Sequence, residues 1–153
     1  MQLTMTGEYA IRTMMHLASK PFGSVVRISD ISKTWSIPVT FLRKIATQLG
    51  KSGLITSQRG RRGGLLLAQR AEEVTLLDIV EAIEGKIALN QCLLTDSFCP
   101  RTGWCAVHLV WAEAQERMKE VLAGKTLSQL AAEDQERNQA HINLRLAVSK
   151  ISG

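Results

Sequence analysis

Three cysteines grouped in one stretch are the side chains of this 153-residue chain best suited to chemistry. Cys92, Cys99 and Cys105 are followed by His108, so the spacing is Cys-x6-Cys-x5-Cys-x2-His. Thiolates are soft ligands that suit iron–sulfur clusters, zinc and Cu(I). Structural zinc usually takes closely spaced cysteine pairs, whereas wider gaps suit a larger inorganic core. The spacing therefore favours an iron–sulfur cluster, with a zinc site and redox-active or inert thiols as alternatives.

Two local features support ligation by this group. Cys105 is expected at the N-terminus of a helix, where the helix dipole favours the thiolate. His108 comes three residues later on the same helical face, so both side chains can point into the cysteine loop. A surface histidine remains the alternative for His108. An odd number of clustered thiols, with no apolar leader before them, predicts a cytoplasmic, metal-binding or redox-active chain rather than a disulfide-bonded one.

A second group of functional residues is basic. Residues 58–64 are rich in glycine and arginine and lie between two short predicted strands, 54–57 and 65–68. Glycines let the backbone turn sharply and approach a ligand closely. Arginines at such a hairpin tip favour the negative potential of a narrow minor groove of DNA. The arginines expected to contact DNA here are Arg59, Arg61 and Arg62.

Three helices are predicted before this hairpin. The first covers 6–19 with Thr6 as its cap, and the second starts near Ser29, which is a good N-cap. A short turn at 36–38 separates the second helix from a third that runs to about Lys51, because Pro38 restricts the residue before it and suits a helix start. Helix, turn, helix and hairpin, in this order, predict a winged helix-turn-helix.

The third helix is expected to enter the major groove. We expect Thr40 and Arg43 to contact base edges there. Lys44 and Lys51 are expected to neutralise phosphate groups instead. The apolar face that we expect to be buried consists of Phe41, Leu42, Ile45 and Leu49.

The charge of the chain is divided in a way that fits this interpretation. Residues 1–65 contain ten Lys/Arg and two acids (+8), and residues 66–153 contain nine Lys/Arg and twelve acids (−3), which together give +5. A basic half predicts a polyanionic partner, and with the helix-turn-helix we expect double-stranded DNA. No run approaches the ~18 apolar residues of a membrane helix, so no membrane partner is expected. The sequence has no Cys-x-x-Cys, nucleotide-binding loop or catalytic triad, and we predict no enzyme activity.

The remainder of the chain is predicted to be mainly helical. A capping box at 75–78 opens a helix that stops at Gly85. A long helix from Cys105 to about Leu122 has apolar residues at coiled-coil spacing, which predicts a dimer seam, with packing on its own domain as the alternative. Thr126 caps a short helix, and residues 142–148 alternate as in a strand without a partner strand. The seam consists of Val107, Trp111, Ala114, Met118 and Val121.

The predicted fold is thus mostly α with a small β-hairpin wing. We divide it into a winged helix-turn-helix DNA-binding domain (1–85), a cysteine-rich cluster-binding loop (86–104), a dimerisation helix with a short C-terminal helix (105–133), and a polar tail (134–153) for which disorder is left open.

Taken together, the segments resemble the Rrf-type winged-helix transcription regulators, which include the IscR, NsrR and RirA regulators. The resemblance extends to about Ala132, and the combination of segments is highly specific although no single one is. The matching segments are 1–4, 8–10, 31–32, 37–38, 41–42, 53–55, 59–64, the three cysteines and 126–130.

The resemblance implies a homodimer, joined through the long helix, that binds a palindromic operator as a repressor, with activation left open. It implies a 2Fe–2S or 4Fe–4S cluster on the three cysteines that senses iron or Fe–S status, redox state or nitric oxide. His108 falls where the iron–sulfur assembly branch supplies a fourth ligand. Glu8 falls where the nitric-oxide branch uses a carboxylate from the other subunit, so the fourth ligand stays open between His108 and Glu8 of the partner subunit.

Two positions depart from the assembly branch of this family. Six residues separate Cys92 from Cys99, one more than in that branch. Arg43 stands where that branch has an acidic residue, which implies a different operator. The alternative function is a cluster-less or zinc-bound winged-helix regulator that senses thiol oxidation or a small ligand.

Overall fold

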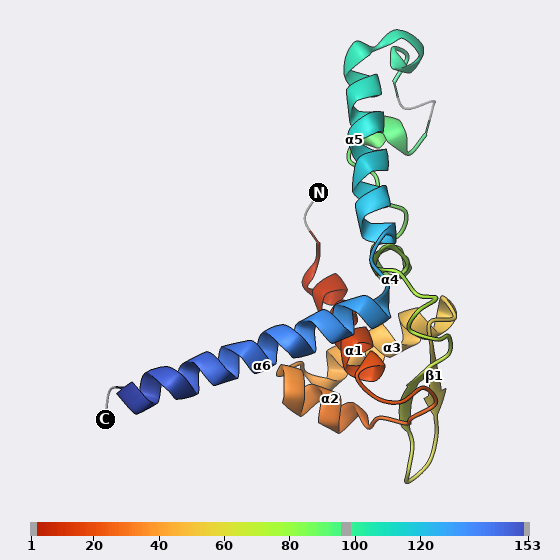
Figure 1. The fold of residues 1–153 in the computed structure, drawn as a ribbon. Helices are drawn as coiled ribbons and strands as arrows, with labels where there is room; N and C mark the ends of the chain where they lie inside the picture. Colours follow the sequence, from red (N-terminus) through yellow and green to blue (C-terminus); the bar gives the residue numbers. More distant parts are fainter. Residues whose placement is uncertain (1–2, 96–98, 152–153) are drawn as a thin grey trace.

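The computed structural model describes residues 3–95 and 99–151, with side chains as far as residue 145. Helices α1–α4 and a two-stranded hairpin form one body, and α5 and α6 extend from it in different directions (Figure 1). The predicted fold, mostly α with a β-hairpin wing, is confirmed. The elements are α1 (Met5–Ala18), α2 (Ile28–Trp35), α3 (Val39–Lys51), β1 (Ile55–Gln58), β2 (Gly64–Leu67), α4 (Leu76–Glu84), the 3-10 helices η1 (Gln91–Leu93) and η2 (Thr102–Trp104), α5 (Ala106–Ala123) and α6 (Leu127–Ile151).

Helix α1 lies at the centre of the body and packs against α3, α4 and the start of α6. Its cap is Thr4, whose hydroxyl accepts a hydrogen bond from the Gly7 N–H at 3.2 Å. The helix therefore begins at Met5, and Thr6, the predicted cap, lies inside it. Burying each large apolar side chain of this core contributes about 1.5–3 kcal/mol. The largest fully buried apolar side chains are Met14, Ile31, Ile37, Leu42, Ile45, Leu49, Leu65, Val74, Ile79 and Leu127.

The turn between α2 and α3 is fixed by local hydrogen bonds and by one anchor. Ser36 adopts a left-handed conformation (φ 53°), and the Ser32 hydroxyl donates to the Ile37 carbonyl at 2.7 Å. Ile37 is 1% exposed, so the turn is pinned to the core. Helix α2 begins at Ile28, after Arg27, without a side-chain cap, so the predicted N-cap Ser29 lies inside the helix instead. This turn sets the direction of α3.

A side-chain hydrogen bond ties α1 to α2. The Trp35 indole N–H donates to Nδ1 of His16 at 3.2 Å. Burial lowers the pKa of His16 below its ordinary value, Lys20 lowers it further, and Asp30 opposes the shift. Because the neutral imidazole can accept a hydrogen bond, the lowered pKa is consistent with this pairing at neutral pH.

The hairpin forms a wing beside α3. Strand β1 pairs antiparallel with β2, from Ile55 opposite Leu67 to Gln58 opposite Gly64, within one residue of the predicted strands. Val26 extends the sheet through two 2.8 Å backbone hydrogen bonds with Leu65. A Cβ added at Gly64 would lie 2.2 Å from the Val26 carbonyl oxygen, so glycine is required for this close approach. The wing is therefore fastened to the segment before α2.

The capping box of α4 is confirmed. The Thr75 N–H donates to the Asp78 carboxylate at 2.8 Å, and the Asp78 N–H donates to the Thr75 hydroxyl at 3.2 Å. Backbone hydrogen bonds also join the start of α4 to the turn between α5 and α6, from Leu76 N–H to Lys125 at 3.0 Å and from Leu127 N–H to Val74 at 2.7 Å. The base of α5 is thus attached to the body.

The C-terminal prediction is wrong in one respect. Helix α6 runs without interruption from Leu127 to Ile151, where the sequence predicted a short helix, a polar tail and a strand-like alternation. The physical reason is that residues 127–151 contain neither glycine nor proline and are rich in Ala, Gln, Glu and Arg, which favour helix. The side chains of Leu146 and Val148, which belonged to that alternation, lie outside the described residues.

Within the residues that the structure describes, no helix combines the length and the apolar character needed to cross a membrane.

Candidate functional site

The polar stripe of α3 lies on the surface of the body. Thr40, Arg43, Lys44 and Lys51, the four residues predicted to contact DNA from this helix, are all exposed. The opposite face is buried and consists of Leu42, Ile45, Ala46 and Leu49. The spacing of this buried face at i, i+3, i+4 and i+7 explains why the basic residues point outward.

One member of the predicted buried face is misplaced. Phe41 is 42% exposed rather than buried. It lies at the edge of the apolar stripe, where its ring meets Tyr9 of α1 edge-on with 6.0 Å between centroids and lies 6.0 Å from the Lys44 ammonium. Ala46, which the sequence analysis did not assign to the buried face, is buried.

The wing brings a second set of basic residues next to α3. Arg59, Arg61 and Arg62 are exposed in the connection between β1 and β2. A cleft of about 440 Å³ separates α3 from the wing, and its lining includes Arg43 and Gly60. The rest of the lining is neutral, which leaves the cleft suited to an anion such as a phosphate backbone. The residues that complete the lining are Ile28, Ala46, Thr47, Ser57, Gln58, Gly63, Gly64 and Leu65.

The cysteine loop is held beside the distal part of α5. Cys92 lies in η1, and Cys105 is the residue immediately before α5, as predicted. The three thiols are half-buried and form no disulfide. Nδ1 of His108 lies 3.5 Å from Sγ of Cys92, although the two residues are 16 positions apart in sequence. The fold therefore brings one predicted thiol ligand to the predicted imidazole ligand.

The other two thiols are not gathered with this pair. In the ranges 3–95 and 99–151, no group of three or more His, Cys, Asp or Glu side chains is close enough to hold a metal ion. Residues 96–98, which belong to the predicted cluster loop, lie outside the described residues. The donor types suit a soft metal or an iron–sulfur core. The arrangement places Cys92 with His108 and leaves ligation by Cys99 and Cys105 a prediction.

Glu8, the alternative fourth ligand from the partner subunit, lies on the surface of α1. Its carboxylate accepts a hydrogen bond from Arg12 at 2.9 Å. This ion pair is exposed and contributes little to stability. A ligand role for the partner subunit's Glu8 stays a prediction.

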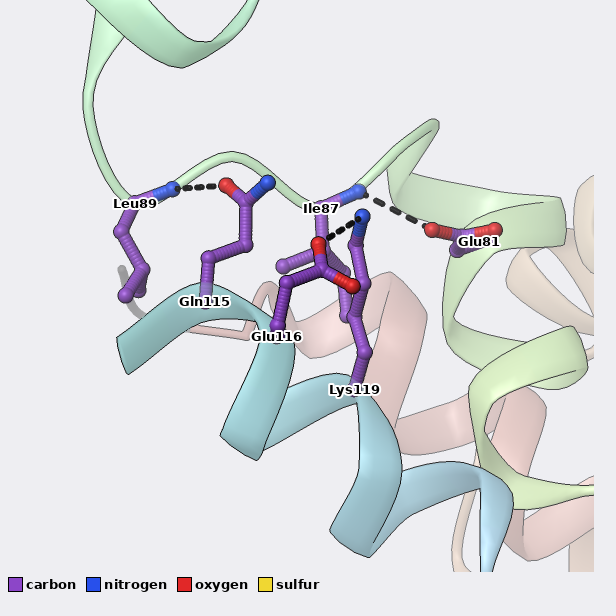
Figure 2. Close-up of polar contacts among 6 residues, drawn as sticks. All are labelled: Glu81, Ile87, Leu89, Gln115, Glu116 and Lys119. Carbon is purple, nitrogen blue, oxygen red and sulfur yellow. Dashed lines mark hydrogen bonds and ion pairs between the residues drawn. The ribbon is translucent and has the colours of Figure 1, made fainter. Parts of the chain in front are cut away.

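Two residues that the sequence analysis missed anchor the chain leading to Cys92 (Figure 2). Oε1 of Gln115 on α5 accepts the Leu89 N–H at 3.2 Å, and Oε1 of Glu81 on α4 accepts the Ile87 N–H at 3.2 Å. A single glutamine or glutamate inside a helix is too common a pattern to have identified either of them. Gln115 becomes evident only when the loop is folded back on α5, and Glu81 only when the chain turns back after α4.

Helix α5 has a large exposed apolar surface. Val107 is 60% exposed and Val121 is 71% exposed, and both belong to the predicted dimer seam. Trp111, also part of the seam, is 39% exposed. Contiguous exposed apolar surface of this kind usually marks an interaction site. These exposures favour a dimer seam over packing of the seam against its own domain, and the dimer stays a prediction.

The fold and this surface define a winged-helix DNA-binding transcription regulator. The family model Rrf2, described as "Iron-dependent Transcriptional regulator", matches residues 3–133. The chain belongs to the Rrf2 family of transcriptional regulators, as the resemblance in sequence predicted. It is a regulator and not an enzyme.

Similar proteins agree with this assignment. The chain is 35% identical over 130 residues to protein rrf2 of Nitratidesulfovibrio vulgaris, covering 85% of this chain and 87% of that protein. It is 30% identical over 130 residues to the HTH-type transcriptional regulator IscR of Pectobacterium atrosepticum, covering 85% and 79%. The structure of CymR, the global cysteine regulator of B. subtilis, matches with a TM-score of 0.72 and 26% identity, covering 87% of this chain and 98% of that chain.

Proposed function

We propose that this protein is a cytoplasmic, homodimeric repressor whose DNA binding depends on an iron–sulfur cluster held by Cys92, Cys99 and Cys105. His108 is the fourth ligand in this proposal. The observation that carries it is the 3.5 Å contact between Nδ1 of His108 and Sγ of Cys92, which joins the two ends of the cysteine loop. The similarity to an IscR regulator supports the same assignment.

Within this chain, the loop is mechanically connected to the DNA-binding body. Cys105 and His108 lie at the distal end of α5, and the other end of α5 is attached to the start of α4 by backbone hydrogen bonds at Leu76 and Leu127. Since a helix transmits a displacement along its axis, a change at the loop can reorient the body. A 2Fe–2S or 4Fe–4S cluster, when bound, would supply a cross-link within the loop that responds to iron, oxidants or nitric oxide.

The exposed apolar face of α5 is proposed to pair with α5 of a second copy. Burial of Val107, Trp111 and Val121 in such a pair would remove much of the exposed apolar surface from water. A two-fold axis at α5 would place two α3 helices on half-sites about one DNA turn apart, which requires a palindromic operator. Thr40 and Arg43 would contact bases there, and Lys44 and Lys51 would contact phosphates.

A second candidate function has its own support. The fold also matches CymR, a cysteine regulator, and the described residues do not gather a metal site. In this alternative, the Cys92 thiol beside His108 is the sensor, and the regulator works without a cluster or with zinc.

Purification without oxygen separates the two functions. We expect the protein to be coloured, with visible absorbance from sulfide-to-iron charge transfer, and to contain iron and acid-labile sulfide in equal amounts. A colourless protein with stoichiometric zinc, or with neither metal, would instead support the thiol-sensing alternative. Metal analysis and the absorbance spectrum of the same sample make this measurement.

A further inference from the structure

We propose that Gln115 is a positioning residue that sets the distance between α5 and the chain carrying Cys92, and so holds Cys92 against His108. The inference deepens the proposed function, because it assigns a residue that arranges the sensing loop. It concerns the side chain that Figure 2 shows reaching from α5 to the Leu89 N–H.

The two contacts on α5 have a spacing similar to that of their partners in the neighbouring chain. Gln115 and His108 are seven residues apart, so they lie on one face of the helix about 10.5 Å apart along its axis. Their partners, Leu89 and Cys92, are three residues apart, a span of at most about 10 Å, and the span is shorter here because Gln91 and Cys92 belong to the 3-10 helix η1. Asn90 between these partners is extended (φ −147°, ψ 152°). The segment therefore runs antiparallel to α5 with contacts at both ends.

Burial of Gln115 makes the loss of its hydrogen bond to Leu89 energetically costly. Gln115 is 8% exposed, and in the described part of the chain the other buried polar side chain is Thr13. A buried amide that loses its partner bears the cost of its lost hydration, so the Gln115–Leu89 pairing is more than a surface contact. The chain just before this segment is anchored independently, since Ile87 is 3% exposed and its N–H donates to Glu81.

Gln115 also connects the loop to the apolar face of α5. The stripe that contains His108 and Gln115 holds the loop, while the neighbouring stripe presents Trp111 and Val121 to the surface. Trp111 lies three residues from His108, which places the two stripes side by side around the helix. A shift of the loop that breaks the Gln115 contact would thus also displace side chains on the helix face proposed to pair with a second copy.

Gln115→Leu tests the inference, because leucine has similar size but no acceptor for the Leu89 N–H. The measurement is the rate of Cys92 alkylation by iodoacetamide, with Cys105 as the internal reference, in the full-length protein after removal of iron. We expect Cys92 to react roughly 5-fold faster in this variant, which is the typical net effect of one hydrogen bond. Hydrogen exchange of the peptide containing Leu89 should increase in parallel.

Two further variants make the test specific. Gln115→Glu keeps a carboxyl oxygen at the acceptor position and should restore slow alkylation. Gln139→Leu makes the same substitution at an exposed position of α6 and should leave both rates unchanged. If Gln115→Leu does not fold, Gln115→Asn takes its place, since its shorter side chain keeps the amide but cannot reach Leu89.

An unchanged Cys92 rate in a folded Gln115 variant would overturn the inference, and so would an equal increase at Cys92 and Cys105, which would indicate general loosening. Because the measurement uses iron-free protein, it is independent of the proposed cluster. Protein that never contains iron or sulfide would refute the proposed function and leave the alkylation result intact.

Discussion

Cys92→Ala, Cys99→Ala and Cys105→Ala are each expected to purify without oxygen as a colourless protein that lacks iron and acid-labile sulfide. Iron–sulfur clusters are held by thiolates, and the loss of one of three leaves too few ligands to retain the inorganic core. The measurement is iron and sulfide content together with visible absorbance. The loss should be essentially complete in each variant, because the described chain offers no spare thiol.

The folding of these variants should not change appreciably, since the three thiols are half-buried and lie outside the main core. Gly103→Ala is the matched control, because it lies in the same loop and an added Cβ there meets nothing within 4 Å. It should bind iron like the unaltered chain. If all three cysteine variants kept iron, sulfide and absorbance unchanged, the assignment of the thiols as ligands would be wrong.

Simultaneous replacement of Arg59, Arg61 and Arg62 by alanine is expected to weaken operator binding by on the order of 100-fold near physiological salt. The three guanidinium groups are exposed at the tip of the wing, next to the cleft that Arg43 lines. Each phosphate contact that is lost should also reduce the slope of log affinity against log salt concentration by roughly 1. Binding titrations at several salt concentrations measure both quantities.

Arg145→Ala is the control for this experiment, because Arg145 is also exposed and belongs to the C-terminal part of α6, a helix that extends away from the wing (Figure 1). It should change neither affinity nor salt slope by a comparable amount. Unaltered affinity and slope in the triple variant would exclude a wing contact.

In the same titrations, Arg43→Ala should lower operator binding more than binding to unrelated duplexes, since base contacts carry the specificity.

Much of the fold could be predicted from local patterns. The capping box at Thr75, the turn at Pro38 and the glycine-rich hairpin depend on residues close in sequence, and all three appear where expected. The length of α6 was missed because a polar segment with good helix propensity can be a helix or a tail, and apolar periodicity does not distinguish them. Phe41 was misplaced because period alone does not fix the edge of a buried stripe.

The site was predictable where residue type limits the chemistry. Cysteines and clustered arginines are informative in any fold, which is why Cys92 and Arg59 were identified. The contact between Cys92 and His108 depends on the loop folding back over 16 residues, and spacing suggested it only as one possibility. Gln115 could not be identified, because its role arises from burial against Leu89 and not from its residue type.

The most direct test compares operator affinity before and after iron removal. The operator would be a palindromic duplex selected from random sequences by the oxygen-free protein, and the measurement is its dissociation constant with the loaded and the chelator-treated protein at one salt concentration. The account predicts that iron removal changes this constant by at least about 10-fold, a typical coupling between two linked sites, and that Cys92→Ala behaves like the iron-free protein. Equal affinity of the loaded and iron-free protein would contradict control of DNA binding by the cysteine loop.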